Sequence, residues 1–394
     1  MRYQIRRVVA DGGMGRVYEA LDMHQGRRVA LKLLHSDVAS DTVAVERFKR
    51  EFEVSSLLPH DHIVEVLDFQ QEGMSYILAM EFLDGEELRT VLKREKIITP
   101  GRLVRMMSQL AIGLDPAHQN QLIHRDLKPD NVFLCGTREG DHVKLLDFGS
   151  VKDKSTKAKK LTVMGTTIGS PFYMAPEQAQ ALDTLDHRAD VWALAAIAYE
   201  SVTGTVPFTG ANGPAILLAI LTKEPVPPSV AGTGAPMPVP PTLDEVMSEA
   251  FAKNPAYRTK SAGALAERIG RAYGLDGDFR TWAVTPQHVL DEKIAAKLPE
   301  LMTKGSIGDP FAVADPFASP PSATGQAAAG GGHQQAPVAT QGPSMESAFN
   351  AQRAPIEPDV PAGIPTKGPP VALIAGGAVL VVVIILVIVL VAMK

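Results

Sequence analysis

One polar segment, His124-Arg125-Asp126-Leu127-Lys128-Pro129-Asp130-Asn131, constrains this chain more than any other feature of its sequence. Sixteen residues after it ends, the chain has Asp147-Phe148-Gly149. Phosphoryl transfer requires a base for the attacking hydroxyl and positive charge to neutralise the transferring phosphate. Asp126 can act as that base, Lys128 can offer charge, and carboxylate and amide oxygens are hard ligands that suit Mg²⁺. The expected metal ligands are Asn131 and Asp147.

These two segments resemble motifs of the eukaryotic-like (Hanks-type) serine/threonine protein kinases, in particular the bacterial membrane-attached branch of that family. The resemblance covers about residues 1–270 and implies an α+β, two-lobed protein kinase fold with a β-rich N-lobe and a helical C-lobe. It also implies ATP as phosphoryl donor, Mg²⁺ as cofactor with Mn²⁺ as a possible replacement, and proteins bearing Ser or Thr as substrates. Lys128 favours serine/threonine specificity, because tyrosine kinases usually carry another residue there.

The ATP-binding residues implied by the resemblance lie upstream, in the order and spacing of the family. Lys32 in Val29-Ala30-Leu31-Lys32 matches the lysine that reaches the α/β-phosphates, and Glu51 matches the helix glutamate that pairs with it. Residues 76–83 resemble the strand that enters the hinge, with Met80 as the gatekeeper. The other residues expected along the nucleotide are Val9, Gly12, Gly15, Val17, Ala30, Glu81 and Leu83.

The glycine-rich loop departs from the family pattern G-x-G-x-x-G-x-V. Ala10 stands where the family has its first glycine, whereas Gly12 and Gly15 match the pattern. Residues 7–9 and 17–20 read as strands, so the loop is expected to close a hairpin over ATP and donate backbone N–H groups to phosphate. Alanine keeps its N–H, so the departure matters if position 10 needs a positive φ.

Residues 147–177 resemble an activation segment that ends at Ala175-Pro176-Glu177. The resemblance implies that Ser170 contacts the catalytic Asp126 and Lys128. It also implies that Arg125 pairs with a phosphate on this segment, since arginine binds phosphate through paired hydrogen bonds. The expected phosphosites are Thr162, Thr166 and Thr167, with Thr166 foremost. Five lysines at 152–160 indicate either a solvated loop or compensation for the phosphate charge.

Three further residues are expected to hold the lower lobe together. Asp190 resembles the aspartate that anchors the catalytic loop, and Arg258 resembles the arginine that pairs with Glu177. Breaking a buried arginine–carboxylate pair on one side is strongly destabilising. Pro116 falls near the end of the helix that begins at Thr99-Pro100, and proline inside a helix predicts a kinked or shortened last turn.

The C-terminal run from Val371 to Met393 has 23 residues and no charge. At about 1.5 Å per residue such a helix matches the hydrocarbon core of a bilayer. We therefore expect one transmembrane helix over 370–393, in the cell inner membrane, with a cytoplasmic kinase domain and essentially no outer domain. Ala372 and Gly376 have small-xxx-small spacing, which leaves a homodimer through this helix open.

Two segments separate the expected catalytic domain from the expected membrane helix. Residues 271–302, including Trp282, read as a helical extension that can pack against the lower lobe. Residues 303–369 are rich in Pro, Ala, Gly, Gln and Ser, which is typical of a disordered linker. The linker repeats Asp-Pro-Phe-Ala at 309 and 315, either by coincidence of composition or as a short docking motif.

Composition excludes several other kinds of protein. A net charge of −5 and the lack of a basic stripe with interleaved aromatics argue against a nucleic-acid partner. The single cysteine, Cys135, excludes an intramolecular disulfide and a cysteine-based zinc site. His60-Asp61-His62 matches a family segment and is expected to be structural, not a metal pair.

Two other function classes remain as alternatives. A pseudokinase scaffold would bind nucleotide or partners without catalysis; the presence of all five catalytic residues argues against it. These are Lys32, Glu51, Asp126, Asn131 and Asp147. A small-molecule kinase of the aminoglycoside type would lack the peptide platform that residues 169–171 and 175–177 predict.

Overall fold

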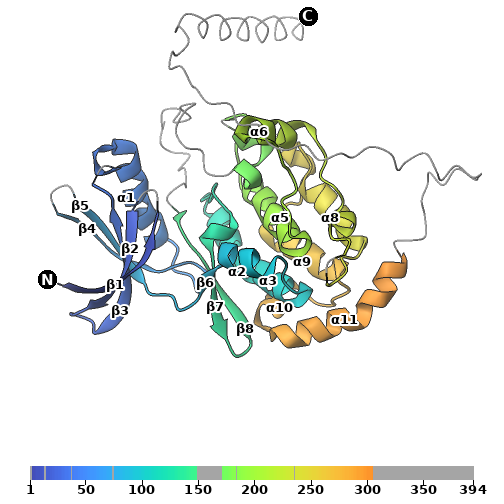
Figure 1. The fold of residues 1–394 in the computed structure, drawn as a ribbon, viewed down its shortest axis with the longest axis horizontal. Helices are drawn as coiled ribbons and strands as arrows, with labels where there is room; N and C mark the ends of the chain where they lie inside the picture. The colour runs from blue at the N-terminus through green and yellow to red at the C-terminus, as the bar shows by residue number, and fades with distance from the viewer. Residues whose placement is uncertain are drawn as a thin grey trace, which may run out of the picture. The chain divides into compact units, whose positions relative to one another are not determined.

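The computed structural model describes residues 2–12, 15–36, 38–72, 75–148, 171–182, 184–234 and 236–304 (Figure 1). They form a β-rich N-terminal lobe and a helical C-terminal lobe, so the predicted two-lobed fold is confirmed. Four predictions lie outside the described residues: the phosphosites, the contact of Ser170, most of the predicted linker and the predicted membrane helix over 370–393. Within the described ranges, the structure contains no helix that combines the length and apolarity needed to cross a membrane.

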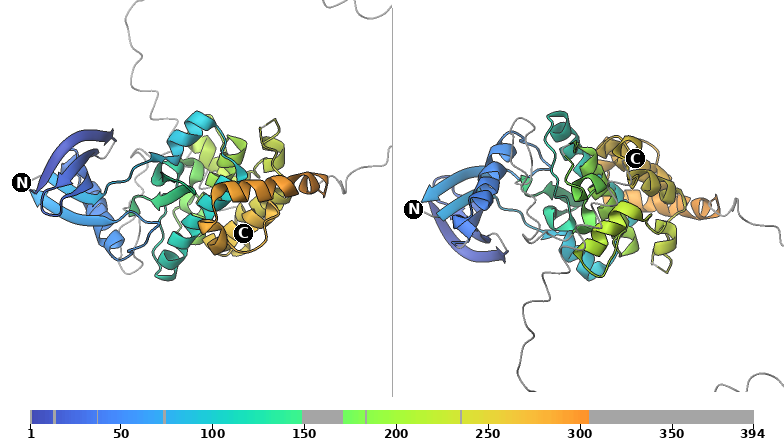
Figure 2. Two further views of the ribbon diagram at one scale, coloured as in Figure 1. Left: turned by 90° about the horizontal axis from the view of Figure 1, so that it is seen from below. Right: turned by 90° about the horizontal axis from the view of Figure 1, so that it is seen from above.

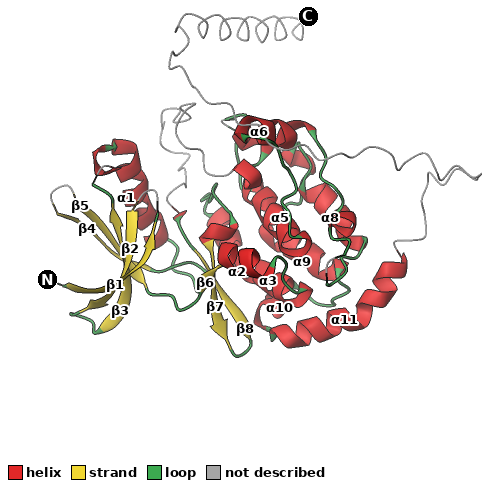
Figure 3. Cartoon of the chain, in the orientation of Figure 1, coloured by secondary structure: helices red, strands yellow, loops and turns green. Residues whose placement is uncertain are grey.

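A five-stranded antiparallel sheet forms the N-terminal lobe, with strand order β1-β2-β3-β5-β4. Its strands are β1 (Tyr3–Asp11), β2 (Gly15–Asp22), β3 (Arg27–Leu34), β4 (Val66–Glu72) and β5 (Ser75–Glu81). Helix α1 (Thr42–Ser56) follows the short 3-10 turn η1 (Val38–Ser40) and packs beside this sheet. Figure 3 shows α1 (red) beside the strands of this sheet (yellow). Phe48 of α1 is buried in one cluster with Leu78 of β5, and this apolar packing fixes the helix against the sheet.

The helical lobe is built around α5 (Arg188–Thr203), in which every residue from Ala189 to Thr203 is buried. Its mostly apolar sequence explains this central place, because a helix that is apolar all round must be covered on all sides. Trp192 of α5 stacks on Phe208 at a ring-centroid distance of 5.4 Å. The surrounding helices are α2 (Leu88–Glu95), α3 (Pro100–Gln119), α4 (Pro176–Ala179), α6 (Gly213–Thr222), α7 (Pro228–Ala231), α8 (Thr242–Ala250) and α9 (Ala262–Ala272).

A second, three-stranded sheet lies in this lobe and carries the segments with the catalytic motifs. Its strands, in order, are β6 (Glu86–Glu87), β7 (Val132–Thr137) and β8 (Gly140–Leu145). The 3-10 turn η2 (Pro129–Asn131) leads directly into β7. Two more 3-10 turns, η4 (Pro171–Tyr173) and η5 (Pro255–Tyr257), lie before α4 and before α9.

Helix α3 continues past Pro116, so of the two predicted effects, a kinked or a shortened last turn, the shortening does not occur. The helix begins at the Thr99 cap, whose hydroxyl accepts a bond from the backbone N–H of Arg102, and continues to Gln119. The helix core around the proline is well packed, since Leu114 and Ala117 are fully buried. Tertiary packing therefore outweighs the cost of proline in this helix.

The predicted helical extension is present as α10 (Phe279–Val284) and α11 (Gln287–Lys304), and both helices pack against α3. Trp282 of α10 is 2% exposed, as expected for a residue that packs on the lower lobe. The predicted domain boundary at residue 270 falls inside α9, because this helix continues to Ala272. Figure 2 shows α11 (orange) along the helical lobe, on the side away from the N-terminal sheet.

Candidate active site

Lys32 of β3 and Glu51 of α1 form the expected ion pair, with Nζ and Oε2 2.7 Å apart. Their side chains are 17% and 5% exposed, and Lys32 Nζ is also 3.8 Å from Oδ2 of Asp147. Burial by itself would lower the pKa of Lys32, but the carboxylates of Asp147 and Glu51 raise it above its ordinary value. The lysine therefore stays charged, held between the carboxylates of Glu51 and Asp147.

The catalytic-loop residues lie within hydrogen-bond distance of one another. Lys128 Nζ is 2.7 Å from Oδ2 of Asp126, whose side chain is 43% exposed and so open to a substrate. Asn131 donates its amide N–H to the backbone carbonyl of Asp126 at 2.7 Å. Because this bond uses the amide nitrogen, the amide oxygen is the atom that Asn131 can offer to a cation.

A backbone hydrogen bond brings the second proposed metal ligand beside the first. The N–H of Leu146 donates to the carbonyl of Asn131 at 2.9 Å, which places Asp147 next to the end of the catalytic loop. Asp147 has φ of 59°, a left-handed conformation that non-glycine residues rarely adopt. Phe148 is fully buried, and its ring meets that of His124 at 4.8 Å. The residue types fit ATP with a divalent cation: a carboxylate and an amide oxygen come from neighbouring segments, and Lys32 lies 3.8 Å from that carboxylate.

Asp190 anchors the catalytic loop from α5. Its carboxylate accepts the backbone N–H groups of His124 and Arg125 at 2.8 and 2.9 Å, and it accepts a third bond from the ring of His118 at 2.8 Å. Burial tends to raise the pKa of Asp190, but the hydrogen bond from His118 and the backbone donors lower it overall. Arg125 has φ of 68°, so the loop is held in a strained conformation by these bonds.

The expected nucleotide hairpin is formed by β1 and β2. Ala10 pairs with Val17 in strand conformation and does not adopt a positive φ, so alanine is tolerated at this position. Gly12 donates its N–H to the carbonyl of Gly15 at 3.1 Å. A Cβ at Gly15 would lie 2.2 Å from the carbonyl oxygen of Leu33, so the close approach of β2 to β3 requires glycine.

The remaining residues expected along ATP lie on strands and on the segment after β5. Ala30 of β3 pairs with Met80 of β5, and Val9 of β1 is 45% exposed. The carboxylate of Glu81 binds Lys144 Nζ at 2.6 Å, so its side chain ties the hinge to β8, and Leu83 lies two residues further on.

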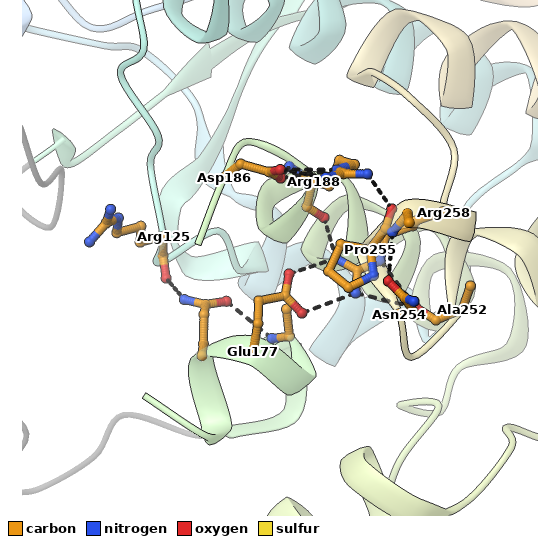
Figure 4. Close-up of polar contacts among 11 residues, drawn as sticks. Arg125, Glu177, Asp186, Arg188, Ala252, Asn254, Pro255 and Arg258 are labelled. Atoms are coloured by element: carbon orange, nitrogen blue, oxygen red, sulfur yellow. Dashed lines mark hydrogen bonds and ion pairs between the residues drawn. The ribbon is translucent and has the colours of Figure 1, made fainter. Parts of the chain in front are cut away.

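Glu177 and Arg258 form a buried bidentate pair in the lower lobe (Figure 4). The two N···O distances are 2.8 and 3.0 Å, and Arg258 also donates to the carbonyl of Arg188 at 2.6 Å. Gln178, the next residue along α4, donates to the carbonyl of Arg125 at 2.8 Å. The bond from Gln178 therefore holds α4 close to the catalytic loop, while the Glu177–Arg258 pair ties the same helix to the segment before α9.

Two of these contacts were not expected from the sequence. His118 bonds to Asp190 of α5, 72 residues away, and supports the catalytic loop through that aspartate. Gln178 bonds directly to Arg125 of the loop, 53 residues away. Neither residue belongs to a motif whose chemistry identifies it, because each acts through one hydrogen bond to a distant residue. His118 lies six residues before His124, and this closeness was its one available signal.

The chain matches the model of the protein kinase domain over residues 3–268. It is 39% identical over 272 residues to the serine/threonine-protein kinase pkn3 of Myxococcus xanthus, covering 68% of this chain and 49% of that protein. It is 37% identical over 273 residues to the serine/threonine-protein kinase PknA of Mycobacterium tuberculosis, covering 68% of this chain and 60% of that protein. The chain thus spans about half the length of these relatives.

The fold is also that of a solved bacterial kinase. A crystal structure of the PknI kinase domain of Mycobacterium tuberculosis superposes with a TM-score of 0.55 at 28% identity, covering 70% of this chain and 96% of that chain. With the domain match, the related sequences and this structural likeness in agreement, the chain belongs to the protein kinase family, in the branch of bacterial Hanks-type serine/threonine kinases.

Proposed function

We propose that this chain is an ATP-dependent serine/threonine protein kinase that transfers the γ-phosphoryl group to Ser or Thr hydroxyls of protein substrates. One observation carries the proposal: a carboxylate–lysine pair, Asp126 with Lys128, lies on the loop that holds Asp147 beside the buried Lys32–Glu51 pair. The relatives that bear the name serine/threonine-protein kinase support the choice of acceptor.

Each residue has a separate task in this proposal. Bound ATP with Mg²⁺, or Mn²⁺ in its place, would supply the phosphoryl group and neutralise its charge. The exposed carboxylate of Asp126 accepts the proton of the substrate hydroxyl, and the ammonium of Lys128 offers charge to the transferring phosphate. Lys32, held by Glu51, binds the α/β-phosphates. The oxygen ligands for the cation come from Asn131 and Asp147.

The test is phosphate transfer by the full chain. Purified protein is incubated with Mg²⁺, radiolabelled ATP and casein, beside Asp126→Asn and a control, Glu292→Ala, which alters an exposed carboxylate on α11. We expect phosphoserine and phosphothreonine from the wild type and the control, and a loss of about 10²–10⁴-fold from Asp126→Asn. A folded wild type that binds ATP but transfers nothing would instead favour the pseudokinase scaffold.

Self-activation is part of the same proposal. We infer that phosphate on Thr162, Thr166 or Thr167 pairs with Arg125, and that Ser170 contacts Asp126 and Lys128. Among the described residues the buried Nε of Arg125 has no hydrogen-bond partner, and its guanidinium points away from the Glu177 cluster (Figure 4). Burial lowers the pKa of Arg125, Asp190 opposes this, and the nearby charge of Arg50 lowers it further. The two guanidinium groups of Arg125 and Arg50, together with the unpaired Nε–H of Arg125, are suited to binding a phosphate group.

Mass spectrometry tests this regulation. After incubation with ATP, we expect phosphate within residues 149–170 of the wild type and none in Asp126→Asn. Arg125→Ala should keep the phosphate yet lose most of the activation that it brings. Equal activity of the phosphorylated and dephosphorylated wild type would refute the regulatory role.

We further propose that residues 370–393 span the inner membrane, tether the kinase on its cytoplasmic side through the 303–369 linker, and pair two copies through small residues. The support is the uncharged apolar run from Val371 to Met393. The full chain should stay in the membrane pellet after carbonate extraction, whereas a chain that lacks 370–394 should not. Equal extraction of both chains would contradict the tether.

A further inference from the structure

The β7–β8 hairpin carries both proposed metal ligands at its open end. Asn131 directly precedes Val132, the first residue of β7, and Val132 pairs with Leu145, the last residue of β8. Asp147 follows two residues after that pair. The orientation of this hairpin therefore sets the spacing between the amide of Asn131 and the carboxylate of Asp147.

The closed end of the hairpin is bound by helices outside the sheet. We call α10 and α11, residues 279–304, the C-terminal brace. The N–H of Gln287, the first residue of α11, donates to the carbonyl of Glu139 in the hairpin turn at 2.8 Å. Arg105 of α3 donates to the carbonyl of Asp141 at 3.3 Å and to the carbonyl of Thr285 between α10 and α11.

Gln109 of α3 is the point where the hairpin and the brace meet. Its side chain is 1% exposed and uses both polar atoms: Nε2 donates to the carbonyls of Asp141 at 3.0 Å and Ala283 at 3.2 Å. Its Oε1 accepts the N–H of Val143 of β8 at 2.7 Å. One buried amide thus bonds β8 on one side and α10 on the other, and buried polar groups are costly to leave unpaired.

Asp291 binds the brace to the start of α3. Its carboxylate accepts the backbone N–H of Gly101 at 2.8 Å and the hydroxyl of Thr99 at 3.1 Å. A carboxylate near the first turn satisfies helix N–H groups that have no partner within the helix and complements the helix dipole. Gln287 and Asp291 are four residues apart, so the bonds to the hairpin and to α3 come from one face of α11.

Apolar packing fixes the brace in place. Leu290 and Ile294 of α11 are 1% and 0% exposed. Trp282 lies over Gly270 of α9, where an added Cβ would come within 2.1 Å of the indole ring. These residues lie beyond residue 268, where the match to the protein kinase domain ends. The brace is therefore an addition of this chain to the part that the family model describes.

We propose that the C-terminal brace positions the β7–β8 hairpin, and with it both metal ligands, and that Asp291 is a positioning residue for the reaction. The proposal rests on the proposed kinase function, because it gives that function a support outside the family domain. Loosening α11 releases the hairpin turn at Glu139, and the open end of the hairpin then varies in orientation.

The experiment uses the full chain with two independent disruptions of one contact. Asp291→Ala removes the acceptor, whereas Gly101→Ala removes no polar group but places a Cβ 2.4 Å from Oδ1 of Asp291. Asp291→Asn keeps an acceptor and serves as the conservative variant. Glu292→Ala, an exposed carboxylate one residue further along α11, is the matched control.

Two readouts separate positioning from mere stability. The first is amide hydrogen exchange of residues 132–145, measured without nucleotide at a temperature where every variant is folded. The second is the rate of phosphate transfer as a function of Mg²⁺ and of ATP. We expect faster exchange in Asp291→Ala and Gly101→Ala, and about tenfold more Mg²⁺ for half-maximal rate with KM for ATP unchanged, since loss of support behind metal ligands typically costs 10–100-fold. Asp291→Asn should restore most of the slow hydrogen exchange of residues 132–145 and most of the wild-type Mg²⁺ dependence.

Faster exchange confined to α11, with residues 132–145 unchanged, would overturn the proposal, because the brace would then only dock on the lobe. The proposal would also be overturned if Asp291→Ala and Gly101→Ala lost stability equally, yet needed the same Mg²⁺ concentration as the wild type for half-maximal rate. Hydrogen exchange requires no activity. If the wild type transfers no phosphate, the proposed function fails while the exchange result still decides whether the brace holds the hairpin.

Discussion

At the scale of single residues, we expect the largest loss of stability when the Glu177–Arg258 pair is broken on one side. The Arg258 side chain is fully buried, and Glu177 supplies its carboxylate partner. Glu177→Ala leaves a buried, uncompensated guanidinium, so we expect the free energy of unfolding to fall by about 3–5 kcal/mol. Glu177→Leu combined with Arg258→Met removes both charges and should cost less. Urea denaturation measures both, with Glu245→Ala, an exposed carboxylate, as control. A double variant less stable than Glu177→Ala would contradict this account.

We expect Tyr→Phe substitutions at two buried tyrosines to change the stability of the protein in opposite directions. The hydroxyl of Tyr273 is buried and has no hydrogen-bond partner among the described residues, whereas Tyr199 donates to the carbonyl of Val226 at 2.8 Å. An unpaired buried hydroxyl costs about 1–3 kcal/mol, and a made hydrogen bond contributes about 1 kcal/mol. Tyr273→Phe should therefore stabilise the protein and Tyr199→Phe should destabilise it. Thermal unfolding under identical conditions compares them; a lower Tm for Tyr273→Phe than for wild type would show that its hydroxyl has a partner.

The functional residues that could be predicted from the sequence are those that belong to a local motif with a known chemical role. Lys32, Asp126 and Asn131 could be found because each lies at a fixed distance from other motif residues. His118 and Gln178 could not, because their roles depend on hydrogen bonds that only the folded chain brings together. Ala10 was uncertain from the sequence, and its strand conformation resolves the question of positive φ.

At the scale of elements, we expect the stability of the protein to depend on pH through His62, which lies in the segment before β4. The ring of His62 donates its Nδ1–H to the carbonyl of Val143 at 2.8 Å and lies 4.8 Å from the ring of His142. Burial lowers the pKa of His62 from 6.5 to about 4; the bond to Val143 opposes this, and the charges of His142 and His60 add to it. Asp61 and Lys144 are the other charged groups nearby, and the pKa of His60 is also lowered.

The sign of the pH effect follows from these shifts. The unfolded chain binds a proton on His62 at a higher pH than the folded chain does, so protonation favours unfolding. Stability is fully present above pH 6.5 and is lost as the pH falls towards 4. Urea denaturation at pH 7.5 and 5.0 should show a smaller loss for His62→Gln than for the wild type. An identical loss in both proteins would exclude His62 as the titrating group.

Elements could be predicted where local signals and packing agree. The Thr99 cap and Pro100 gave the start of α3 correctly. Pro116 was expected to kink or shorten the last turn; the helix is not shortened at this residue, because buried neighbours offset the penalty of the proline. The boundary at 270 was set by the extent of the family resemblance, but the packing of Trp282 on Gly270 makes α9 and α10 continuous in space.

At the scale of the whole molecule, the folded unit is larger than the family domain. A chain that ends at Ala272 loses α10 and α11, and with them the buried side chains of Trp282, Leu290 and Ile294. It also leaves the polar atoms of Gln109 partly unpaired. Removing one buried tryptophan side chain alone costs about 3–5 kcal/mol, and each kcal/mol lowers Tm by about 2–4 °C in a domain of this size. We therefore expect Tm to fall by about 10 °C or more.

The matched comparison is a chain that ends at Lys304, which keeps every described contact of the brace. Differential scanning fluorimetry of the two truncated chains and the full chain measures the effect, and far-ultraviolet circular dichroism checks that each is folded. The chain ending at Lys304 should melt close to the full chain, because its buried core is intact. If the chain ending at Ala272 has the same Tm as the full chain, the expectation is wrong. The family domain would then be stable by itself, and the faces of α3 that α10 and α11 cover would not need them.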